Sequence, residues 1–200
     1  MNLHFFSEKE AATQEIWRDR RTLFFKPLLR ILTSLGVSAN AVTIFGIAAG
    51  LAFPFLVTSY PFLAVCMIVL HLLADGIDGP LGRYQNTTSQ SGSLFDMIAD
   101  HTVMVCVMIG LLVLGLVDPI QSLIYVYTYI LLVVFLVVRN IIKKPAGYIM
   151  RTKYILYASY AIYAATGFEI YEWLIPIFIA ATIFPLLSSI LVIAREKQYD

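Results

Sequence analysis

Six long apolar runs dominate this sequence and restrict it to one class of fold. A helix needs about 20 apolar residues to cross the hydrocarbon core of a bilayer, and several of the runs reach that length alone. Hydrophobic residues make up 60% of the chain and charged residues only 14%, outside the usual range for a soluble domain. The sequence therefore predicts one all-α integral membrane domain over residues 1–200, with a six-helix transmembrane bundle over about 38–195. The runs cover residues 39–58, 62–74, 94–117, 120–142, 154–166 and 173–194.

The distribution of basic residues predicts how this bundle is oriented. With six spans, all 14 Lys and Arg residues fall in terminal segments or loops on one side of the membrane. The loops on the other side hold only the acidic residues Asp118, Glu169 and Glu172. By the positive-inside rule, both termini are predicted to be cytoplasmic, in the cytoplasmic membrane if the source is prokaryotic.

Residues 8–35 are predicted to form an amphipathic helix that lies on the membrane surface. Apolar side chains recur there at helical spacing, while polar and basic side chains step by four along another face. Such a helix buries aromatic side chains at the acyl boundary and places arginines among anionic headgroups. Pro27 is expected to break or kink it near its end. The apolar set is Ile16, Trp17, Leu23, Phe24 and Leu28, and the polar set is Arg18, Thr22, Lys26 and Arg30.

Four aspartates, Asp75, Asp78, Asp96 and Asp100, stand near the junction of the second and third helices. Carboxylates in a membrane are costly and mark functional sites by default. The members of each pair are three or four residues apart, so each pair shares one helix face. In an antiparallel hairpin, equal distances from the turn place Asp78 opposite Asp96 and Asp75 opposite Asp100. All four are predicted to converge, with the active site near the cytoplasmic ends of these helices.

Four converging carboxylates repel one another unless cations lie among them. The ligands on offer are oxygens, with only His71 and His101 nearby, which suits Mg²⁺ or Mn²⁺ rather than Zn²⁺. Two such ions would polarise a phosphoryl oxygen and stabilise both the attacking and the leaving group. The aspartates therefore predict a two-metal site for phosphoryl transfer.

Glycines at every third position, Gly76, Gly79 and Gly82, leave a strip free of side chains beside the first two aspartates. Arg83 follows with a guanidinium suited to bidentate contact with phosphate. Both features also have a structural explanation, because small residues pack membrane helices and an arginine at a helix end anchors topology. Next to four aspartates, we interpret them as ligand-binding.

The segment from Asp75 to Asp100 resembles the signature of the CDP-alcohol phosphatidyltransferase family. That signature reads D-x2-D-G-x2-A-R-x8-G-x3-D-x3-D, and this sequence departs from it in having Gly82 in place of the alanine. Weaker similarity covers residues 35–43 and Ser89. The resemblance implies a six-helix membrane bundle, a CDP-activated substrate and a homodimer. No nucleic-acid partner is expected.

The resemblance also implies a role for each matched position. Asp75, Asp78 and Asp96 would ligate metal, and Asp100 would act as the general base and contact the second ion. Pro80, inside the motif, is expected to kink its helix. The implied CDP contacts are Asp78, Gly79, Gly82, Arg83, Ser89 and Gly92.

The implied activity is transfer of a phosphatidyl group from CDP-diacylglycerol, or a similar CDP-lipid, to a small polar alcohol with release of CMP. That alcohol could carry a phosphate, because basic residues gather between the fourth and fifth runs. The positive-inside rule demands the same residues of a short cytoplasmic loop, so both interpretations stay open. The residues are Arg139, Lys143, Arg151 and Lys153.

Three other functions fit parts of the pattern. The enzyme could transfer a phospho-alcohol from a soluble CDP-alcohol to diacylglycerol, since the motif does not fix which substrate is the lipid. The aspartates could belong to a divalent-cation transporter, although no acidic or strongly polar residues continue along the other spans. An inactive relative is the third alternative, and the intact aspartates argue against it.

Overall fold

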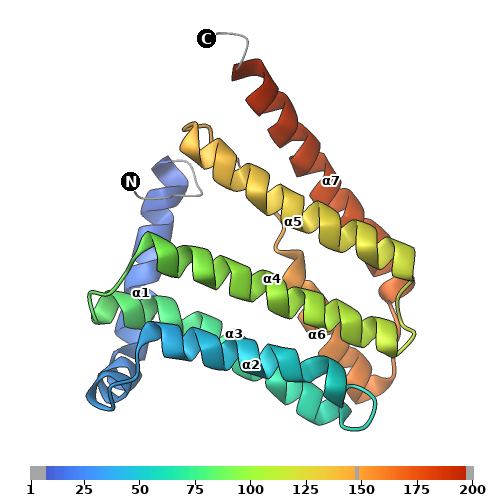
Figure 1. Ribbon diagram of the computed structural model, residues 1–200, viewed down its shortest axis with the longest axis horizontal. Helices are drawn as coiled ribbons and strands as arrows, with labels where there is room; N and C mark the ends of the chain where they lie inside the picture. The colour runs from blue at the N-terminus through green and yellow to red at the C-terminus, as the bar shows by residue number, and fades with distance from the viewer. Residues whose placement is uncertain (1–7, 147–148, 197–200) are drawn as a thin grey trace.

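The computed structural model describes residues 8–146 and 149–196, and these residues form seven helices and no strand (Figure 1). The predicted all-α class is therefore confirmed for the described chain. The helices are α1 (Glu8–Ser34), α2 (Ala39–Leu56), α3 (Pro61–Tyr84), α4 (Gln90–Val113), α5 (Pro119–Ile141), α6 (Thr152–Thr166) and α7 (Tyr171–Glu196).

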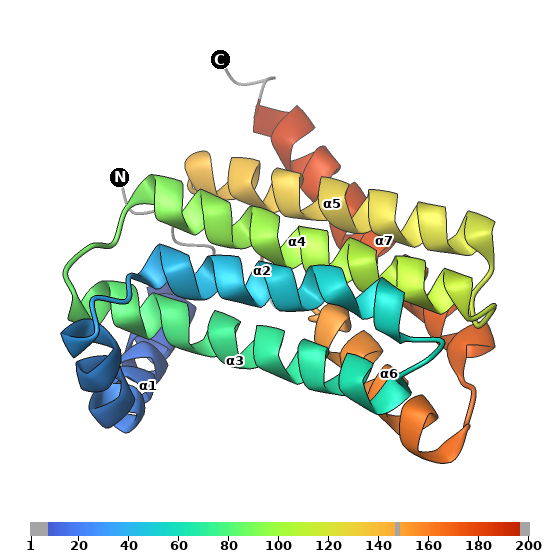
Figure 2. The same ribbon diagram turned by 60° about the horizontal axis from the view of Figure 1, so that its bottom comes forward.

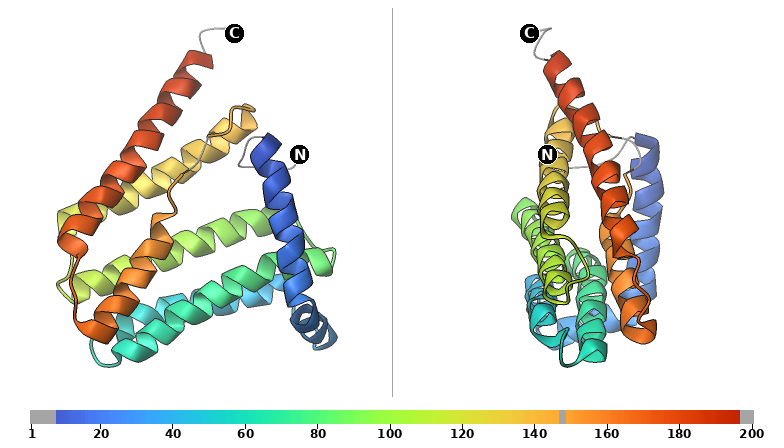
Figure 3. Two further views of the ribbon diagram at one scale, coloured as in Figure 1. Left: turned by 180° about the vertical axis from the view of Figure 1, so that it is seen from behind. Right: turned by 90° about the vertical axis from the view of Figure 1, so that its right-hand side faces the viewer.

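Helices α2 to α5 run alongside one another, and α1 lies across one end of this array (Figure 2). Helix α2 packs against both α3 and α4, α6 contacts α3, and α7 packs against α5. The C-terminal part of α7 leans away from the other helices (Figure 3). Helix α2 is thus the shared neighbour of the two helices that carry the aspartates.

Polar caps fix where three of these helices begin. The side chains of Ser38, Ser89 and Asp118 accept hydrogen bonds from the backbone N–H three residues further on, at 3.2, 3.0 and 2.9 Å. Each bond satisfies an amide that has no partner within its helix. The first two caps start α2 and α4 at the end of the bundle where α3 finishes (Figure 2).

Five of the described helices are long and apolar enough to cross a membrane, which makes the chain a multi-pass integral membrane protein. The candidate spans are Ala39–Leu56, Pro61–Tyr84, Ser91–Val113, Pro119–Ile141 and Tyr171–Arg195. Helix α6 has only 15 residues, so it is about 22 Å long, less than a hydrocarbon core of about 30 Å. The predicted count of six spans is not confirmed.

Helix α1 runs through Pro27 without the predicted break, although its axis changes direction toward its C-terminal end (Figure 1). Among its described side chains, Leu23 and Phe24 are largely exposed, whereas Leu29 is fully buried against the bundle. The predicted apolar residues Ile16 and Trp17, with Arg18 on the polar face, lie outside the described side chains. The position of α1 on the membrane surface stays a prediction.

Helix α3 likewise continues through the buried Pro80 to Tyr84.

Two glycines deeper in the bundle let α2 and α4 approach closely. A Cβ atom on Gly50 would collide with Val103, and one on Gly110 would collide with Phe53. This close contact holds α4 firmly against α2, and it therefore sets the position of the aspartates that α4 carries.

Candidate metal and nucleotide site

The α3–α4 hairpin brings all four aspartates into one electrostatic cluster. Asp96 interacts most strongly with Asp78 among the carboxylates, and also with Asp100 and Asp75. Asp75 and Asp100 lie near enough to each other to interact electrostatically. These neighbours match the register expected for an antiparallel hairpin, in which residues equally far from the turn lie at one depth.

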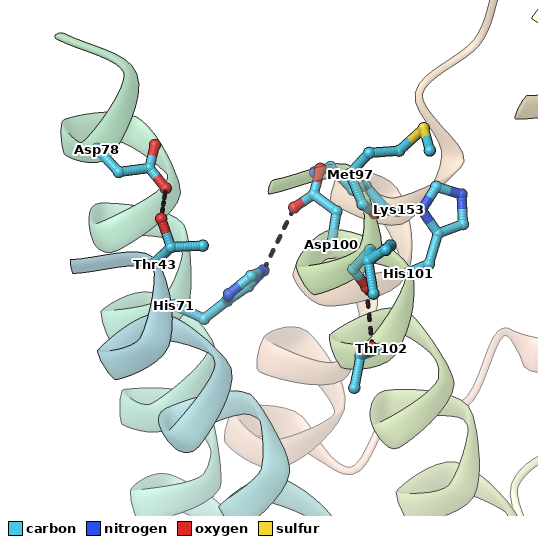
Figure 4. Close-up of polar contacts among 9 residues, drawn as sticks. Thr43, His71, Asp78, Met97, Asp100, His101, Thr102 and Lys153 are labelled. Atoms are coloured by element: carbon cyan, nitrogen blue, oxygen red, sulfur yellow. Dashed lines mark hydrogen bonds and ion pairs between the residues drawn. The ribbon is translucent and has the colours of Figure 1, made fainter. Parts of the chain in front are cut away.

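Asp78 is buried and is held from two sides. The hydroxyl of Thr43 in α2 donates to its Oδ2 at 2.7 Å, and the backbone N–H of Gly79 donates to its Oδ1 at 2.6 Å (Figure 4). Only 5% of Asp78 is exposed. Because a buried carboxylate is costly without donors, Thr43 is part of the site. Its only signal in the sequence is the weak family similarity of residues 35–43.

Asp100 forms an ion pair with Lys153 of α6, whose amine donates to Asp100 Oδ2. Its other oxygen, Oδ1, faces Nε2 of His71 at 3.8 Å (Figure 4). Lys153 is buried, although the sequence placed it in a cytoplasmic loop with the other basic residues. The link between Lys153 and Asp100 joins positions 53 residues apart, and nothing in the local sequence pattern indicates it.

The donor chemistry of the cluster suits a hard cation. Carboxylate oxygens dominate it, and such oxygens are the ligands that Mg²⁺ and Mn²⁺ prefer. In the described chain, however, no group of three or more His, Cys, Asp or Glu side chains lies at metal-binding spacing. Asp78 is turned toward Thr43 and Asp100 toward Lys153 (Figure 4). The aspartates are thus of the chemical type that binds Mg²⁺ or Mn²⁺, and their ligation of an ion stays a prediction.

A small polar cavity of about 100 Å³ adjoins the cluster, between the starts of α2 and α4 and the end of α3. Five of the six predicted CDP contacts line it, the exception being Arg83. The cavity also has polar walls outside the predicted CDP contacts, from Asn40, Thr43, Thr87, Thr88 and Ser93. The predicted residues that line it are Asp78, Gly79, Gly82, Ser89 and Gly92.

Arg83 lies at the edge of this cavity and is held by α1. Its Nη2 and Nε atoms donate to the hydroxyl of Thr22 at 3.2 and 3.4 Å. A Cβ atom on Gly79 would lie 3.6 Å from Nη1 of Arg83, so the guanidinium lies beside the backbone of this glycine. Gln85 adds a second link to α1, because its amide donates to Thr33 and to the carbonyl of Val37.

The four basic residues predicted to bind the acceptor occupy different environments. Arg139 donates to the carbonyls of Lys144 and Pro145 at 2.8 and 3.1 Å, which closes the end of α5. Lys143 and Arg151 are exposed, whereas Lys153 is buried at Asp100. Their role with the acceptor stays a prediction.

A larger groove of about 450 Å³ lies between α4 and α5 and is almost entirely apolar. His101 lines it, pointing away from the side of α4 on which Asp100 meets His71 (Figure 4). Nδ1 of His101 lies 2.6 Å from the carbonyl oxygen of Met97 in its own helix. Neither the groove nor His101 therefore belongs to the aspartate cluster.

Comparison with known proteins agrees with this geometry. A bacterial relative, an inner membrane protein named YnjF from Escherichia coli, is 39% identical over 74 residues, covering 34% of this chain and 36% of the relative. The CDP-diacylglycerol–serine O-phosphatidyltransferase of Helicobacter pylori is 40% identical over 62 residues, covering 30% and 26%. The chain thus matches only about a quarter to a third of the length of these curated relatives.

The fold also matches a solved structure. Phosphatidylinositol phosphate synthase of Mycobacterium tuberculosis, crystallised with manganese and citrate, superposes with a TM-score of 0.67 at 20% identity, covering 82% of this chain and 86% of the other. At that identity the likeness establishes a shared fold. The family model for CDP-alcohol phosphatidyltransferases matches residues 36–193, which include every aspartate of the cluster. The chain therefore belongs to the CDP-alcohol phosphatidyltransferase family.

Proposed function

We propose that this protein is a phospholipid-synthesising enzyme that transfers a phosphatidyl group from CDP-diacylglycerol, or a similar CDP-lipid, to a small polar alcohol. The observation that carries the proposal is the aspartate cluster beside a polar cavity, both built from the family motif. The cavity lies at the helix ends, where a nucleotide can enter from water while the lipid tails stay among the helices.

In the reaction, the oxygen of the acceptor alcohol forms a bond to the phosphorus of the phosphatidyl group, and the bond from that phosphorus to CMP breaks. Asp100 takes the proton of the attacking hydroxyl, because a hydroxyl is a weak nucleophile at neutral pH. CMP leaves with the electron pair. Arg83, beside the glycine strip, stabilises the charge that develops on the departing phosphate.

Two divalent cations, Mg²⁺ or Mn²⁺, would be held by Asp75, Asp78, Asp96 and Asp100. When bound, they supply charge stabilisation at the phosphoryl group. Gly79, Gly82, Ser89 and Gly92 would contact the CDP moiety, and their lining of the cavity supports this assignment. Arg139, Lys143, Arg151 and Lys153 would bind a phosphate on the acceptor, and of these Lys153 lies beside the proposed base, Asp100.

We further propose that α6 is a sixth crossing and that both termini and the site face the cytoplasm. Lys153, at the start of α6, contacts Asp100, which lies ten residues into α4 and hence about 15 Å from its first residue. The connection after α5 therefore already descends into the bundle, so a short α6 suffices for the remaining depth. Irregular backbone is tolerated at such depth where it is packed in protein.

The whole chain is then one domain, with α1 lying on the membrane surface. A homodimer follows from the family resemblance, and the many exposed apolar side chains on the membrane helices offer a surface for it or for lipid.

The test is CMP release by the purified protein in lipid, with CDP-diacylglycerol, Mg²⁺ or Mn²⁺, and a panel of alcohols with and without phosphate. Release that depends on both the alcohol and the metal is expected. Release that instead requires diacylglycerol and a soluble CDP-alcohol would show that the acceptor, and not the CDP-activated donor, is the lipid. Metal uptake into vesicles without CMP release would favour the transporter.

A further inference from the structure

His71 of α3 is a buried polar residue that the reaction described above does not use. Only 3% of it is exposed. Its Nε2 atom has no hydrogen-bond partner in the described chain, and neither has Oδ1 of Asp100, the atom it faces at 3.8 Å (Figure 4). Buried polar atoms are paired in the great majority of proteins, so two such atoms facing each other call for an explanation.

The surroundings of His71 fix the direction of its ring. A Cβ atom on Gly46 of α2 would lie 3.5 Å from Nδ1, so the glycine leaves room for the imidazole. The ring of Tyr157 in α6 meets the ring of His71 edge to face, with centroids 6.1 Å apart. With its flanks packed by α2 and α6, the imidazole presents Nε2 to Asp100.

An apolar residue would fill this position at lower cost. His71 lies in the run 62–74, which is otherwise almost wholly apolar, and burying an imidazole whose Nε2 atom has no partner costs free energy there. Packing alone therefore does not account for a histidine here. The carboxylate of Asp100, toward which the ring points, accounts for the histidine.

We propose that His71 is a positioning residue for Asp100. In the reacting complex, Nε2–H of His71 donates to Oδ1 of Asp100, while Lys153 holds Oδ2 from the opposite side. Closing the present 3.8 Å separation needs a shift of under about 1 Å, and hydrogen bonds in active sites commonly tighten in this way when substrate binds.

Holding both oxygens fixes the plane of the carboxylate. Each oxygen keeps a second lone pair, so Asp100 can still accept the proton of the acceptor hydroxyl. The inference rests on the proposed function, in which Asp100 is that base. It adds a residue outside the family motif that sets the geometry of the base.

Three substitutions test which atom matters. His71→Gln places an amide N–H near the position of Nε2, His71→Asn reaches only the position of Nδ1, and His71→Leu supplies no donor. Roughly 10- to 100-fold lower kcat is expected for the Asn and Leu variants, as for other residues that orient a reacting group. The Gln variant is expected to recover most of the loss. KM for the CDP-lipid should stay unchanged in all three, because the nucleotide cavity is untouched.

His101→Leu is the matched control. It makes the same substitution beside Asp100 but on the face of α4 that lines the apolar groove, so kcat should stay at the wild-type value. Thermal unfolding checks that each variant folds. Should His71→Leu fail to fold, the comparison between the Gln and Asn variants carries the test.

Mn²⁺ titration in the absence of substrate separates positioning from ligation. Unchanged affinity in the His71 variants is expected, whereas a loss in all three would make His71 a metal ligand and overturn the proposal. Wild-type kcat in His71→Leu with an inactive Asp100→Asn would also overturn it, but would leave the proposed function standing. An active Asp100→Asn would remove the proposed base itself, and the inference with it.

Discussion

The α3–α4 hairpin and the α5–α6 connection both bring charge to the site, but they do so by different means. The hairpin presents its aspartates on two regular helices, joined by a turn of five residues from 85 to 89. In the connection between α5 and α6, the described residues 142–146 and 149–151 lie outside any helix, and Lys153 follows on the first turn of α6. Helical register fixes the positions of the aspartates, whereas the path of the connection decides where Lys153 lies.

This difference matters for how each region tolerates change. Backbone hydrogen bonds within α3 and α4, and close contact with α2, keep the aspartates in place when one of them is altered. Lys153 is held by Asp100, and the residue before it, Thr152, is fully buried and shares a hydrogen bond of 2.7 Å with the hydroxyl of Tyr125. We expect substitutions in the hairpin to affect chemistry most, and those at the connection to affect stability as well.

The largest expected effect is that of Asp100→Asn in the hairpin. Loss of the general base should lower kcat for CMP release by about 10²- to 10⁴-fold. Asp118→Asn is the matched control, because Asn caps a helix as well as Asp and this cap lies at the start of α5, away from the cluster. Equal activity of the two variants would show that Asp100 is not the base.

A smaller effect, on stability as well as on activity, is expected for Lys153→Met just after the connection. Asp100 would then lack its cationic partner among other carboxylates, which should destabilise the fold by roughly 1–3 kcal/mol, moderated because Asp100 is 25% exposed. Lys143→Met removes the same charge from an exposed site and should leave thermal stability unchanged. If both variants unfold at the same temperature, the buried ion pair contributes nothing to stability.

Thr22→Val tests whether α1 helps to hold the arginine of the motif. Loss of the hydroxyl that accepts from Arg83 should raise KM for the CDP-lipid by about 5-fold, equivalent to roughly 1 kcal/mol for one hydrogen bond. Ser34→Ala, which removes a bond made only within α1, serves as the control. A KM that does not respond to Thr22→Val would mean that the hydroxyl of Thr22 does not help to orient Arg83.

The smallest effect is expected where this sequence departs from the family signature. A Cβ atom at Gly82 would lie 3.5 Å from Ala39 and 3.7 Å from Thr88, which are ordinary contacts. Gly82→Ala should therefore leave stability within about 1 kcal/mol of the parent, with a gain from helix propensity. Gly50→Ala is the contrasting variant and should cost about 1–3 kcal/mol, because its Cβ collides with Val103. Thermal unfolding of the two proteins would test the contrast.

Much of the hairpin could be read directly from the sequence. The spacing of Asp75 and Asp78, and of Asp96 and Asp100, places each pair on one helix face, and equal distances from the turn align the pairs. The all-α class and the family followed from apolar run length and from the motif. Local periodicity governs all of these features, so residues near one another in the chain suffice to predict them.

The number of spans was less predictable, because length and hydropathy describe each segment alone. The sequence shows an apolar run at 154–166, but not that Lys153, just before it, meets Asp100 of α4. For the same reason Lys153 was expected in a loop. A break or kink in α1 near Pro27 was also expected. The helix continues through Pro27, with a change in the direction of its axis toward its C-terminal end (Figure 1), because a proline removes one backbone bond and the remaining turns still hold the helix.

The sequence by itself determined on which helices and helix faces the motif residues lie, since helical spacing is a local property. Only the tertiary structure decided their partners. Lys153 pairs with Asp100, Thr22 holds Arg83, and His71 faces Asp100, across 53, 61 and 29 positions of the chain. Such contacts depend on how separate helices pack, and packing is set by many small interactions along whole helix faces that no single motif records.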